Sequence, residues 1–255
     1  MKLSLSNGIF SKLSVKANLE TVKRLGFDNI EFNMKSIKKE QDTGVYREQK
    51  ALADSGLNCL SLHSAVLHVA DPIEVHQAVY YGKISIECAR ALKAPLMVVH
   101  SNVAKTLQRK QRERCLREVF GEIVPFAKKM GVKLALENLS VGSSGFGING
   151  EQLAEVLGII DVKSEMGVTF DLCHALETGV MDELLETYGN RICNVHMANK
   201  DHQPFMKKAP ELSRFLAKLH TFGYEGPITL ELEHRASMET IVGAKTFLEG
   251  EIKNL

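Results

Sequence analysis

Strand-like apolar runs recur eight times along this chain, and a helix-like pattern of apolar residues follows each of them. We expect strands at Lys2–Ser6, Asn29–Asn33, Asn58–His63, Leu96–His100, Lys133–Glu137, Gly167–Asp171, Ile192–His196 and Pro227–Glu233. We expect helices at Val15–Leu25, Tyr46–Ser55, Pro72–Leu92, Thr106–Met130, Glu151–Ile160, Met181–Tyr188, Ala209–Phe222 and Ser237–Lys253. Eight such units in 255 residues predict an α/β fold of the (β/α)8 TIM-barrel type, with parallel strands inside a ring of helices.

An open, doubly wound parallel sheet is the alternative arrangement of the same alternating elements. The sequence has no GxGxxG and no GxxxxGK(S/T) after any expected strand, so it lacks the glycine-rich turns that bind phosphates in doubly wound nucleotide-binding folds. No linker, low-complexity tract or short repeat divides the chain. We therefore expect a single barrel domain over residues 1–255.

Charge and cysteine content argue against several classes of partner. The 32 Lys and Arg residues almost balance the 31 Asp and Glu residues, which makes nucleic acid an unfavoured partner. The five cysteines are widely spaced and form no CxxC pair, so we expect reduced thiols and a cytoplasmic location. The N-terminus lacks the apolar core of a signal peptide, and no apolar run has the length of a membrane span. We expect a soluble protein that acts on a small molecule, as a single chain or as a homo-oligomer.

Acidic and histidine side chains stand at the ends of four consecutive expected strands, the fifth to the eighth: Glu137, Asp171, His196 and Glu231. In a parallel barrel these ends meet at one mouth, so residues far apart in sequence become neighbours. A carboxylate in a run as apolar as Val168–Ala175 is costly to bury unless it is paired or metal-bound. A divalent cation lets neighbouring carboxylates stay ionised, and this ligand set suits Mn²⁺, Mg²⁺ or Co²⁺, with Zn²⁺ as a further candidate. We predict one divalent metal ion at the mouth.

Further polar side chains follow other strands. His63 and His100 end the third and fourth strands, and His174 comes three residues after Asp171, where we expect a loop. A single histidine at a strand end is more often a hydrogen-bonded polar residue than a ligand, so His63 and His100 taken one at a time are weak candidates for a functional role. Glu31, at the end of the second strand, is either a substrate contact or an ordinary polar residue at the barrel top.

The last strand leaves a choice between two glutamates. Glu231 and Glu233 share one face of it, because side chains along a strand alternate with a period of two. The position relative to Pro227 favours Glu231, whereas a register slip favours Glu233. The glycine-rich segment 140–150 follows Glu137 and is either a lid over a small substrate or a plain connection.

Several segments together resemble the xylose-isomerase-like barrels, a superfamily that includes sugar isomerases, sugar epimerases and apurinic-site endonucleases. They are Leu136–Asn138, Phe170–Ala175, Asn194–His196 and Gly223–Glu231, and the likeness extends over nearly the whole chain in order. The resemblance implies four metal ligands, Glu137, Asp171, His196 and Glu231. It implies that His174 is a substrate contact or supports a ligand. His63 and His100 would either join Glu137 around an additional metal, as in the endonuclease branch, or line the pocket.

Two departures separate this chain from the endonuclease branch. Asn199 stands where the family often has an aspartate three residues after the histidine ligand, and Lys207–Ala209 replaces a glycine-rich turn. Nuclease members use an Asp-x-His pair there for a third metal, whereas Asp201 directly precedes His202 here. We therefore do not expect the full three-metal phosphodiesterase site.

The leading hypothesis is a metal-dependent isomerase or epimerase of a small sugar or keto-sugar, working by proton transfer through an enediolate. A cation that holds a carbonyl and a neighbouring hydroxyl oxygen acidifies the C–H bond between them. Glu137 and Glu231 would act as base and acid on opposite faces of the planar intermediate. The candidate substrate-binding residues His63, His100 and His174 would bind hydroxyl groups of the sugar. The alternatives are a multi-metal phosphodiesterase, a dehydratase of a hydroxy-keto acid, and a sugar or metal sensor without catalysis.

Overall fold

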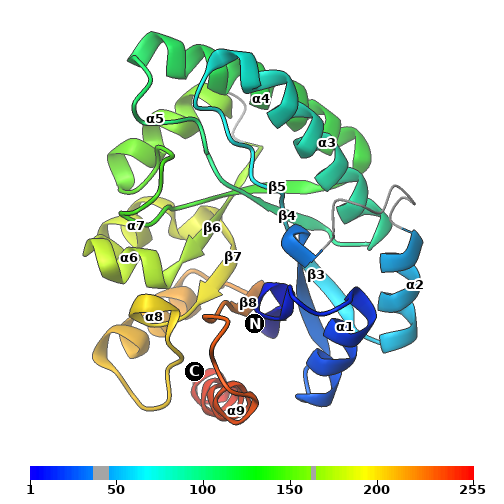
Figure 1. Cartoon of the computed structure of the whole chain (residues 1–255). Helices are drawn as coiled ribbons and strands as arrows, with labels where there is room; N and C mark the ends of the chain where they lie inside the picture. The colour runs from blue at the N-terminus through cyan, green and yellow to red at the C-terminus, as the bar shows by residue number, and fades with distance from the viewer. Residues whose placement is uncertain (37–45, 162–164) are drawn as a thin grey trace.

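The computed structural model describes residues 1–36, 46–161 and 165–255 of the chain. Eight parallel strands form a closed barrel in sequence order, with β1 paired to both β2 and β8 (Figure 1). The strands are β1 (Lys2–Ser6), β2 (Asn29–Asn33), β3 (Asn58–His63), β4 (Leu96–Val99), β5 (Lys133–Glu137), β6 (Gly167–Asp171), β7 (Ile192–Met197) and β8 (Pro227–Leu230). The TIM-barrel prediction is confirmed.

Helices surround the barrel and cover the outer face of its strands (Figure 1). In the described ranges they are α1 (Val15–Arg24), α2 (Tyr46–Ser55), α3 (Val75–Ala91), α4 (Arg109–Met130), α5 (Gly150–Ile160), α6 (Leu172–Thr178), α7 (Met181–Tyr188), α8 (Pro210–Thr221) and α9 (Met238–Lys253). All of them except α6 correspond to expected helices. Because each strand runs from the same end of the barrel, the carboxyl ends of all strands open on one mouth.

The structure places the short helix α6 where the sequence predicted a loop. Asp171 ends β6, and its carboxylate accepts the backbone N–H of His174 at 2.7 Å, which caps the first turn of the helix. Gly179 ends α6 in the left-handed conformation, with φ of 73°. His174 therefore lies on a helix and not in a loop, and its backbone is tied directly to Asp171.

Most of the other boundaries that differ from the expected ones do so by a single residue, and three differ by more. The helix expected from Pro72 begins with a separate 3₁₀ turn, Pro72–Glu74, which Asp71 caps before α3 starts. The fourth helix begins at Arg109 and not at Thr106. The last strand ends at Leu230 and not at Glu233, because its pairing with β1 and β7 stops there.

Alternate residues of each strand divide the buried side chains into two layers. On the outer layer Phe170 packs against Phe215 of α8, with ring centroids 5.0 Å apart, and burial of one such ring contributes about 1.5–3 kcal/mol. On the inner layer Ser4 and Thr229 share a hydrogen bond of 2.7 Å. Glu31, also fully buried, lies on this inner layer. The barrel interior below the mouth is therefore partly polar, and it can hold charged groups only if they are hydrogen-bonded.

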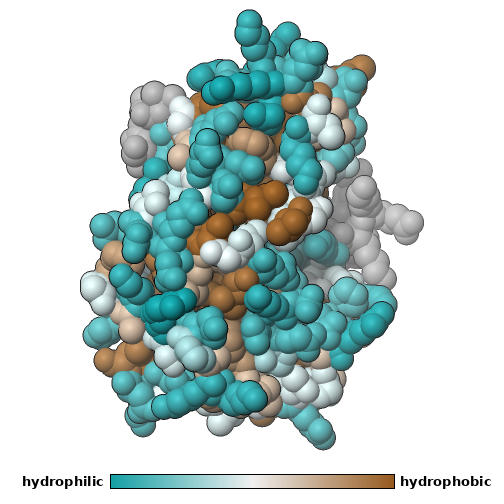
Figure 2. All heavy atoms as spheres, turned by 90° about the vertical axis from the view of Figure 1, so that its left-hand side faces the viewer, coloured by the Kyte–Doolittle hydropathy of each residue, from teal (hydrophilic) through white to brown (hydrophobic). Residues whose placement is uncertain are grey.

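The outer surface is mainly hydrophilic on the face that lies at the left of Figure 1. Figure 2 shows this face, where apolar residues gather in a strip near the middle. None of the helices in the described part of the chain combines the length and the apolar content that a bilayer span needs. All five cysteines are unpaired, as predicted, and four of them are buried.

Candidate metal centre

The four predicted metal ligands converge at the mouth of the barrel. Glu137 and Asp171 are the last residues of β5 and β6, His196 lies in β7, and Glu231 directly follows β8. One ligand atom of each side chain lies within 4.8 Å of a ligand atom of every other. Three of these residues are buried, and Glu231 is partly exposed. The structure thus brings the four residues together, while their role as ligands stays a prediction.

The imidazole of His196 lies at the centre of this group. Its Nδ1 lies 3.0 Å from Oε2 of Glu231, 3.2 Å from Oε1 of Glu137 and 3.6 Å from Oδ2 of Asp171. Burial disfavours the charged ring, but the carboxylates around it outweigh burial and raise the pKa of His196 well above its ordinary value. In the metal-free protein a protonated His196 therefore offsets part of the negative charge.

The pKa values of the carboxylates shift in the opposite direction. Burial opposes ionisation of Glu137, but His196 and His100 outweigh it and hold the pKa of Glu137 well below its usual range. Burial also opposes ionisation of Glu231, and His196 again outweighs it and lowers the pKa of Glu231. Both glutamates are therefore ionised at neutral pH and available to hold a cation or to accept a proton.

The donor set fits a divalent cation. Oδ2 of Asp171 is buried and receives no hydrogen bond from any residue that the structure describes, so one acceptor is left open within the group. Three carboxylates and one imidazole are ligands that Mn²⁺, Mg²⁺, Co²⁺ and Zn²⁺ accept. A cation held here would satisfy Asp171 and offset the repulsion among the carboxylates. No cysteine belongs to the group in the described ranges, unlike in most closed structural zinc sites.

A second group of potential ligands shares Glu137. Nε2 of His100 and Nε2 of His63 lie 2.8 Å and 3.6 Å from Oε2 of Glu137. Nδ1 of His63 donates to the carbonyl of Ser64 at 3.2 Å, and burial lowers the pKa of His63. The neutral ring therefore directs the lone pair of Nε2 toward a carboxylate oxygen, an arrangement that a cation between the two would stabilise. The candidate substrate-binding residues His63 and His100 thus lie beside Glu137.

His174, the third candidate substrate-binding residue, faces the same carboxylates from α6. Its Nδ1 donates to the carbonyl of Asn138 at 2.9 Å and lies 3.6 Å from Oδ2 of Asp171. Burial disfavours the charged ring, but Asp171 and Glu137 outweigh it and raise the pKa of His174. Because Nδ1 is engaged by a backbone carbonyl, this nitrogen is not available to a metal.

Asn138 belongs to the site although the sequence did not single it out. Its Nδ2 donates to the carbonyl of Asp171 at 3.0 Å, and its Oδ1 accepts the N–H of Asp171 at 2.8 Å. These two bonds fix the end of β6 against the end of β5. The available signal was its position directly after Glu137, because a polar residue there can bond to the neighbouring strand.

Glu31 is not the substrate contact that the sequence left open. Its side chain is fully buried inside the barrel, where Oε2 lies 3.1 Å from Nε2 of His196. A substrate at the mouth cannot reach it, so that interpretation is wrong. No local signal predicted this contact, because the two residues are 165 positions apart.

The segment after β8 decides between Glu231 and Glu233. Glu231 joins the group around His196, whereas Oε1 of Glu233 accepts a hydrogen bond from exposed Gln203 at 2.8 Å. Nδ1 of His202 donates to the carbonyl of Glu231 at 3.0 Å. Within the described ranges His202 and the preceding aspartate belong to neither group of potential ligands.

Comparison with known proteins places this geometry in a family. Residues 19–249 match the sequence profile of the family described as xylose isomerase-like TIM barrel. The chain belongs to this family. An uncharacterized protein of Methanocaldococcus jannaschii is 30% identical over 167 residues, which cover 58% of this xylose isomerase-like barrel and 57% of the relative. A probable endonuclease 4 of Campylobacter concisus is 29% identical over 146 residues, or 55% of this chain and 52% of that protein.

The chain thus spans between about half and two thirds of the length of these curated relatives. Solved structures cover it more completely. A D-tagatose 3-epimerase-like protein superposes with a TM-score of 0.80 at 22% identity, covering 99% of this chain and 97% of that one. L-ribulose 3-epimerase superposes with a TM-score of 0.83 at 17% identity, covering 99% and 95%. At these identities the likeness establishes a shared fold.

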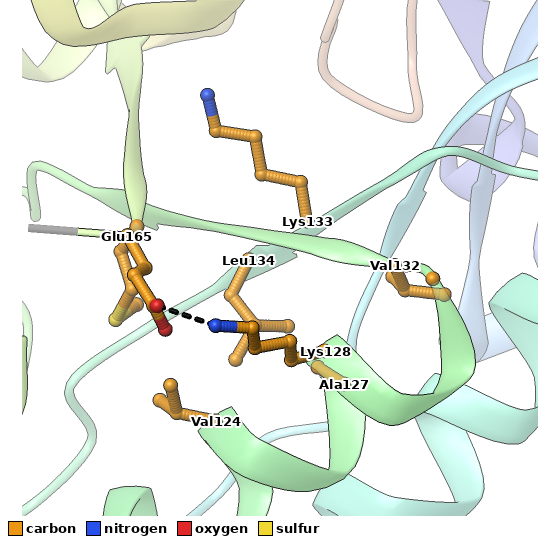
Figure 3. Close-up of a pocket in the computed structure, with 9 residues that line it drawn as sticks. Val124, Ala127, Lys128, Val132, Lys133, Leu134 and Glu165 are labelled. Carbon is orange, nitrogen blue, oxygen red and sulfur yellow. Dashed lines mark hydrogen bonds and ion pairs between the residues drawn. The ribbon is translucent and has the colours of Figure 1, made fainter.

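The xylose isomerase-like barrel also has a cleft of about 430 Å³ at its opposite, amino-terminal end. Figure 3 shows this cleft between the end of α4 and the start of β5, with Val124, Val132 and Leu134 on its walls. Lys128 and Glu165 form an ion pair of 2.6 Å at its side. None of the predicted site residues lines this cleft, so it is separate from the candidate metal centre.

Proposed function

We propose that this chain is a divalent-metal-dependent epimerase or isomerase of a small ketose, in which Glu137 and Glu231 transfer the proton. The observation that carries the proposal is the convergence of three carboxylates and His196 within 4.8 Å at the barrel mouth. The superposable structures include L-ribulose 3-epimerase and a D-tagatose 3-epimerase-like protein, and these names are in keeping with a small sugar substrate. The five unpaired cysteines support a cytoplasmic setting, and self-association of the chain is a further expectation.

Glu137, Asp171, His196 and Glu231 would hold the metal. When bound, a divalent ion supplies Lewis acidity toward a carbonyl and an adjacent hydroxyl, and Mn²⁺, Mg²⁺ or Co²⁺ suits these ligands best, with Zn²⁺ as the further candidate. Asp171 is the most constrained of the four, because it also caps α6 and is clamped by Asn138. It therefore acts as a fixed ligand that takes no part in proton transfer.

Glu137 and Glu231 share the proton transfer, one as the acceptor of a proton and the other as the donor. They come from β5 and from the residue after β8, so they approach the centre from different sides of the mouth. Epimerisation needs removal of a proton from one face of a carbon next to a carbonyl and its return to the other face. An ionised glutamate accepts the first proton. The second carboxylate takes up a proton from solvent water and gives it to the opposite face of the carbon. The planar intermediate between these steps is an enediolate.

His63, His100 and His174 would bind substrate hydroxyls. His100 is the most open of the three, with its side chain 24% exposed, whereas the side chains of His63 and His174 are 8% and 10% exposed. His100 is therefore the first of these residues to meet a ligand that enters the mouth. All three lie within 3.7 Å of Glu137, so a hydroxyl bound to them is positioned beside the proposed base.

Solvent hydrogen exchange tests the proposal. Purified protein loaded with Mn²⁺ is incubated with a panel of ketoses in D₂O, and deuterium uptake at the carbon beside the carbonyl is followed by NMR. The proposal predicts uptake into at least one ketose, dependent on the metal and lost on addition of a chelator. No uptake into any ketose by a metal-loaded protein would contradict it.

Hydrolysis of a phosphodiester is the second candidate function. The observation in its favour is the second group formed by His63, His100 and Glu137, which would add a metal beside the first. The similarity to a probable endonuclease 4 of Campylobacter concisus supports it. Metal-dependent nicking of abasic DNA would establish this function in place of the first. Absence of nicking with two Zn²⁺ ions bound would exclude it.

A further inference from the structure

The buried carboxylate of Glu31 connects three strands inside the barrel. Its Oε2 accepts a hydrogen bond from Ser61 of β3 at 2.8 Å and from Asn194 of β7 at 3.2 Å. The same oxygen lies 3.1 Å from Nε2 of His196. Glu31 is 0% exposed, so no substrate at the mouth reaches it. Its contact with the proposed metal centre is through the imidazole of His196.

This contact determines which nitrogen of His196 carries the proton. Oε2 of Glu31 is already the acceptor for Ser61 and Asn194, so Nε2 must donate to it as well. A neutral imidazole has one N–H and one lone pair, which leaves the lone pair on Nδ1. Nδ1 is the nitrogen that lies 3.0 Å from Glu231 and 3.2 Å from Glu137. The ring therefore presents its lone pair to the carboxylates with which it would share a cation.

We infer that Glu31 is a positioning residue of the metal centre, holding the proton of His196 on Nε2 so that Nδ1 is free to bind a divalent cation. This inference rests on the proposed metal-dependent function. Local folding alone does not explain the carboxylate. A buried charge is costly, and Oε1 of Glu31 finds no hydrogen-bond donor among the residues that the structure describes. A carboxylate behind a metal-binding histidine fixes both the tautomer and the ring orientation.

The test combines metal affinity with a direct view of the tautomer. Glu31→Gln keeps the size of the side chain but replaces the charge with a neutral amide. Ser4→Ala is the matched control, because Ser4 is also buried in the barrel interior and its hydroxyl shares a hydrogen bond with Thr229 and not with Glu31 among the described residues. Affinity for Mn²⁺ is measured by calorimetric titration. Long-range ¹H–¹⁵N NMR of the Zn²⁺-loaded protein assigns the protonated nitrogen of His196.

The expected result is about a 10–100-fold loss of Mn²⁺ affinity in Glu31→Gln and no loss in Ser4→Ala. Zn²⁺-loaded wild-type protein is expected to carry the proton on Nε2 with Nδ1 bound to the metal. A wild-type signal from Nδ1–H would overturn the inference without reference to any variant. Unchanged Mn²⁺ affinity in folded Glu31→Gln would overturn it as well.

Failure of this inference is distinguishable from failure of the proposed function. If the wild-type protein binds neither Mn²⁺ nor Zn²⁺, the proposed function fails. The tautomer is then measured in the metal-free protein at alkaline pH, where the ring is neutral. An Nε2–H signal there supports the hydrogen bond to Glu31, and an Nδ1–H signal contradicts it.

Discussion

Oε2 of Glu231 lies 3.0 Å from Nδ1 of His196, although the side chain of Glu231 is 21% exposed and that of His196 only 1%. The pair thus runs from the solvent-facing side of the mouth to the buried centre. Glu231 is the only partly exposed member of its four-residue group in the described ranges. Within this four-residue set Glu231 is therefore the side chain most open to a substrate, and His196 lies beneath it.

Glu231→Gln should remove turnover while leaving the fold intact. The amide cannot take or return a proton, and general acid–base groups contribute about 10²–10⁴-fold to rate. Deuterium uptake into a ketose measures the loss. Glu233→Gln is the matched control, because Glu233 contacts exposed Gln203 and should leave the rate unchanged. Full proton exchange in Glu231→Gln would contradict the assignment.

Two substitutions of Asp171 should separate its proposed role in metal binding from its role as the N-cap of α6. Asp171→Asn keeps a good N-cap for α6, so its stability should stay close to wild type, but it loses the charge that faces Nδ1 of His196. We expect metal affinity to fall by more than the roughly 10–100-fold typical of residues behind a ligand. Asp171→Ala should lose the same affinity and in addition about 1 kcal/mol of stability. Calorimetric titration and thermal melting measure the two effects, and equal stability of both variants would argue against the cap.

Metal affinity should rise with pH across the neutral range. Carboxylates raise the pKa of His196 well above its ordinary value of about 6.5, so a metal must displace a proton from Nδ1. Below the raised pKa, displacement of one proton increases affinity about tenfold per pH unit. Mn²⁺ titrations at pH 6, 7 and 8 in matched ionic strength measure it, and a pH-independent affinity would contradict the coupling.

The stability of the metal-free protein should fall as the pH rises. The folded state has the higher pKa, so His196 contributes stability that is fully present below pH ~6.5 and is lost as the pH rises through the folded value. Glu137 has a lowered pKa, and its contribution is lost only on acidification, so it stays constant in this range. The melting temperature of chelator-treated protein between pH 6 and 9 measures the loss, and a rise with pH would refute it.

Asn138→Ala should misplace Asp171 and weaken metal binding. It removes two hydrogen bonds to the backbone of Asp171 and leaves buried groups unpaired, at a cost of about 1–3 kcal/mol each. Asn29→Ala is the control, because it removes a hydrogen bond to Leu3 at the other end of the barrel. Both variants should lose stability, but only Asn138→Ala should lose affinity for Mn²⁺. Equal affinities in the two variants would limit Asn138 to a structural role.

The strands were predictable because each is a short apolar run whose first and last residues are clear in the sequence. The bounds of β1, β2, β3, β5 and β6 coincide with the expected ones. Helix α6 was missed because its seven residues are too few for a helical period to appear between a strand and a loop. The available signals were Asp171 as a cap and Gly179 as a stop. The extension of β8 to Glu233 was wrong because alternation continued after the pairing ended at Leu230.

The sequence predicted which residues of the candidate site lie together only where they end neighbouring strands of the barrel. Glu137, Asp171 and His196 end neighbouring parallel strands, so the fold alone brings them together. The contact of Glu31 with His196 crosses the barrel interior, and no periodicity links two residues 165 positions apart. Asn138 was passed over because an amide after a strand has many ordinary uses. Residues that support ligands thus need three-dimensional contacts to be found.

Metal content per chain shows whether the four residues at the barrel mouth hold a divalent cation. Wild-type protein and His196→Ala are equilibrated with Mn²⁺, freed of unbound ion by gel filtration and measured by inductively coupled plasma mass spectrometry. We expect one Mn²⁺ per wild-type chain and almost none in His196→Ala. Two or three Zn²⁺ ions after equilibration with zinc would move the phosphodiesterase function ahead. Wild-type protein without bound metal, or equal metal in both proteins, would contradict the claim that these residues hold a divalent cation.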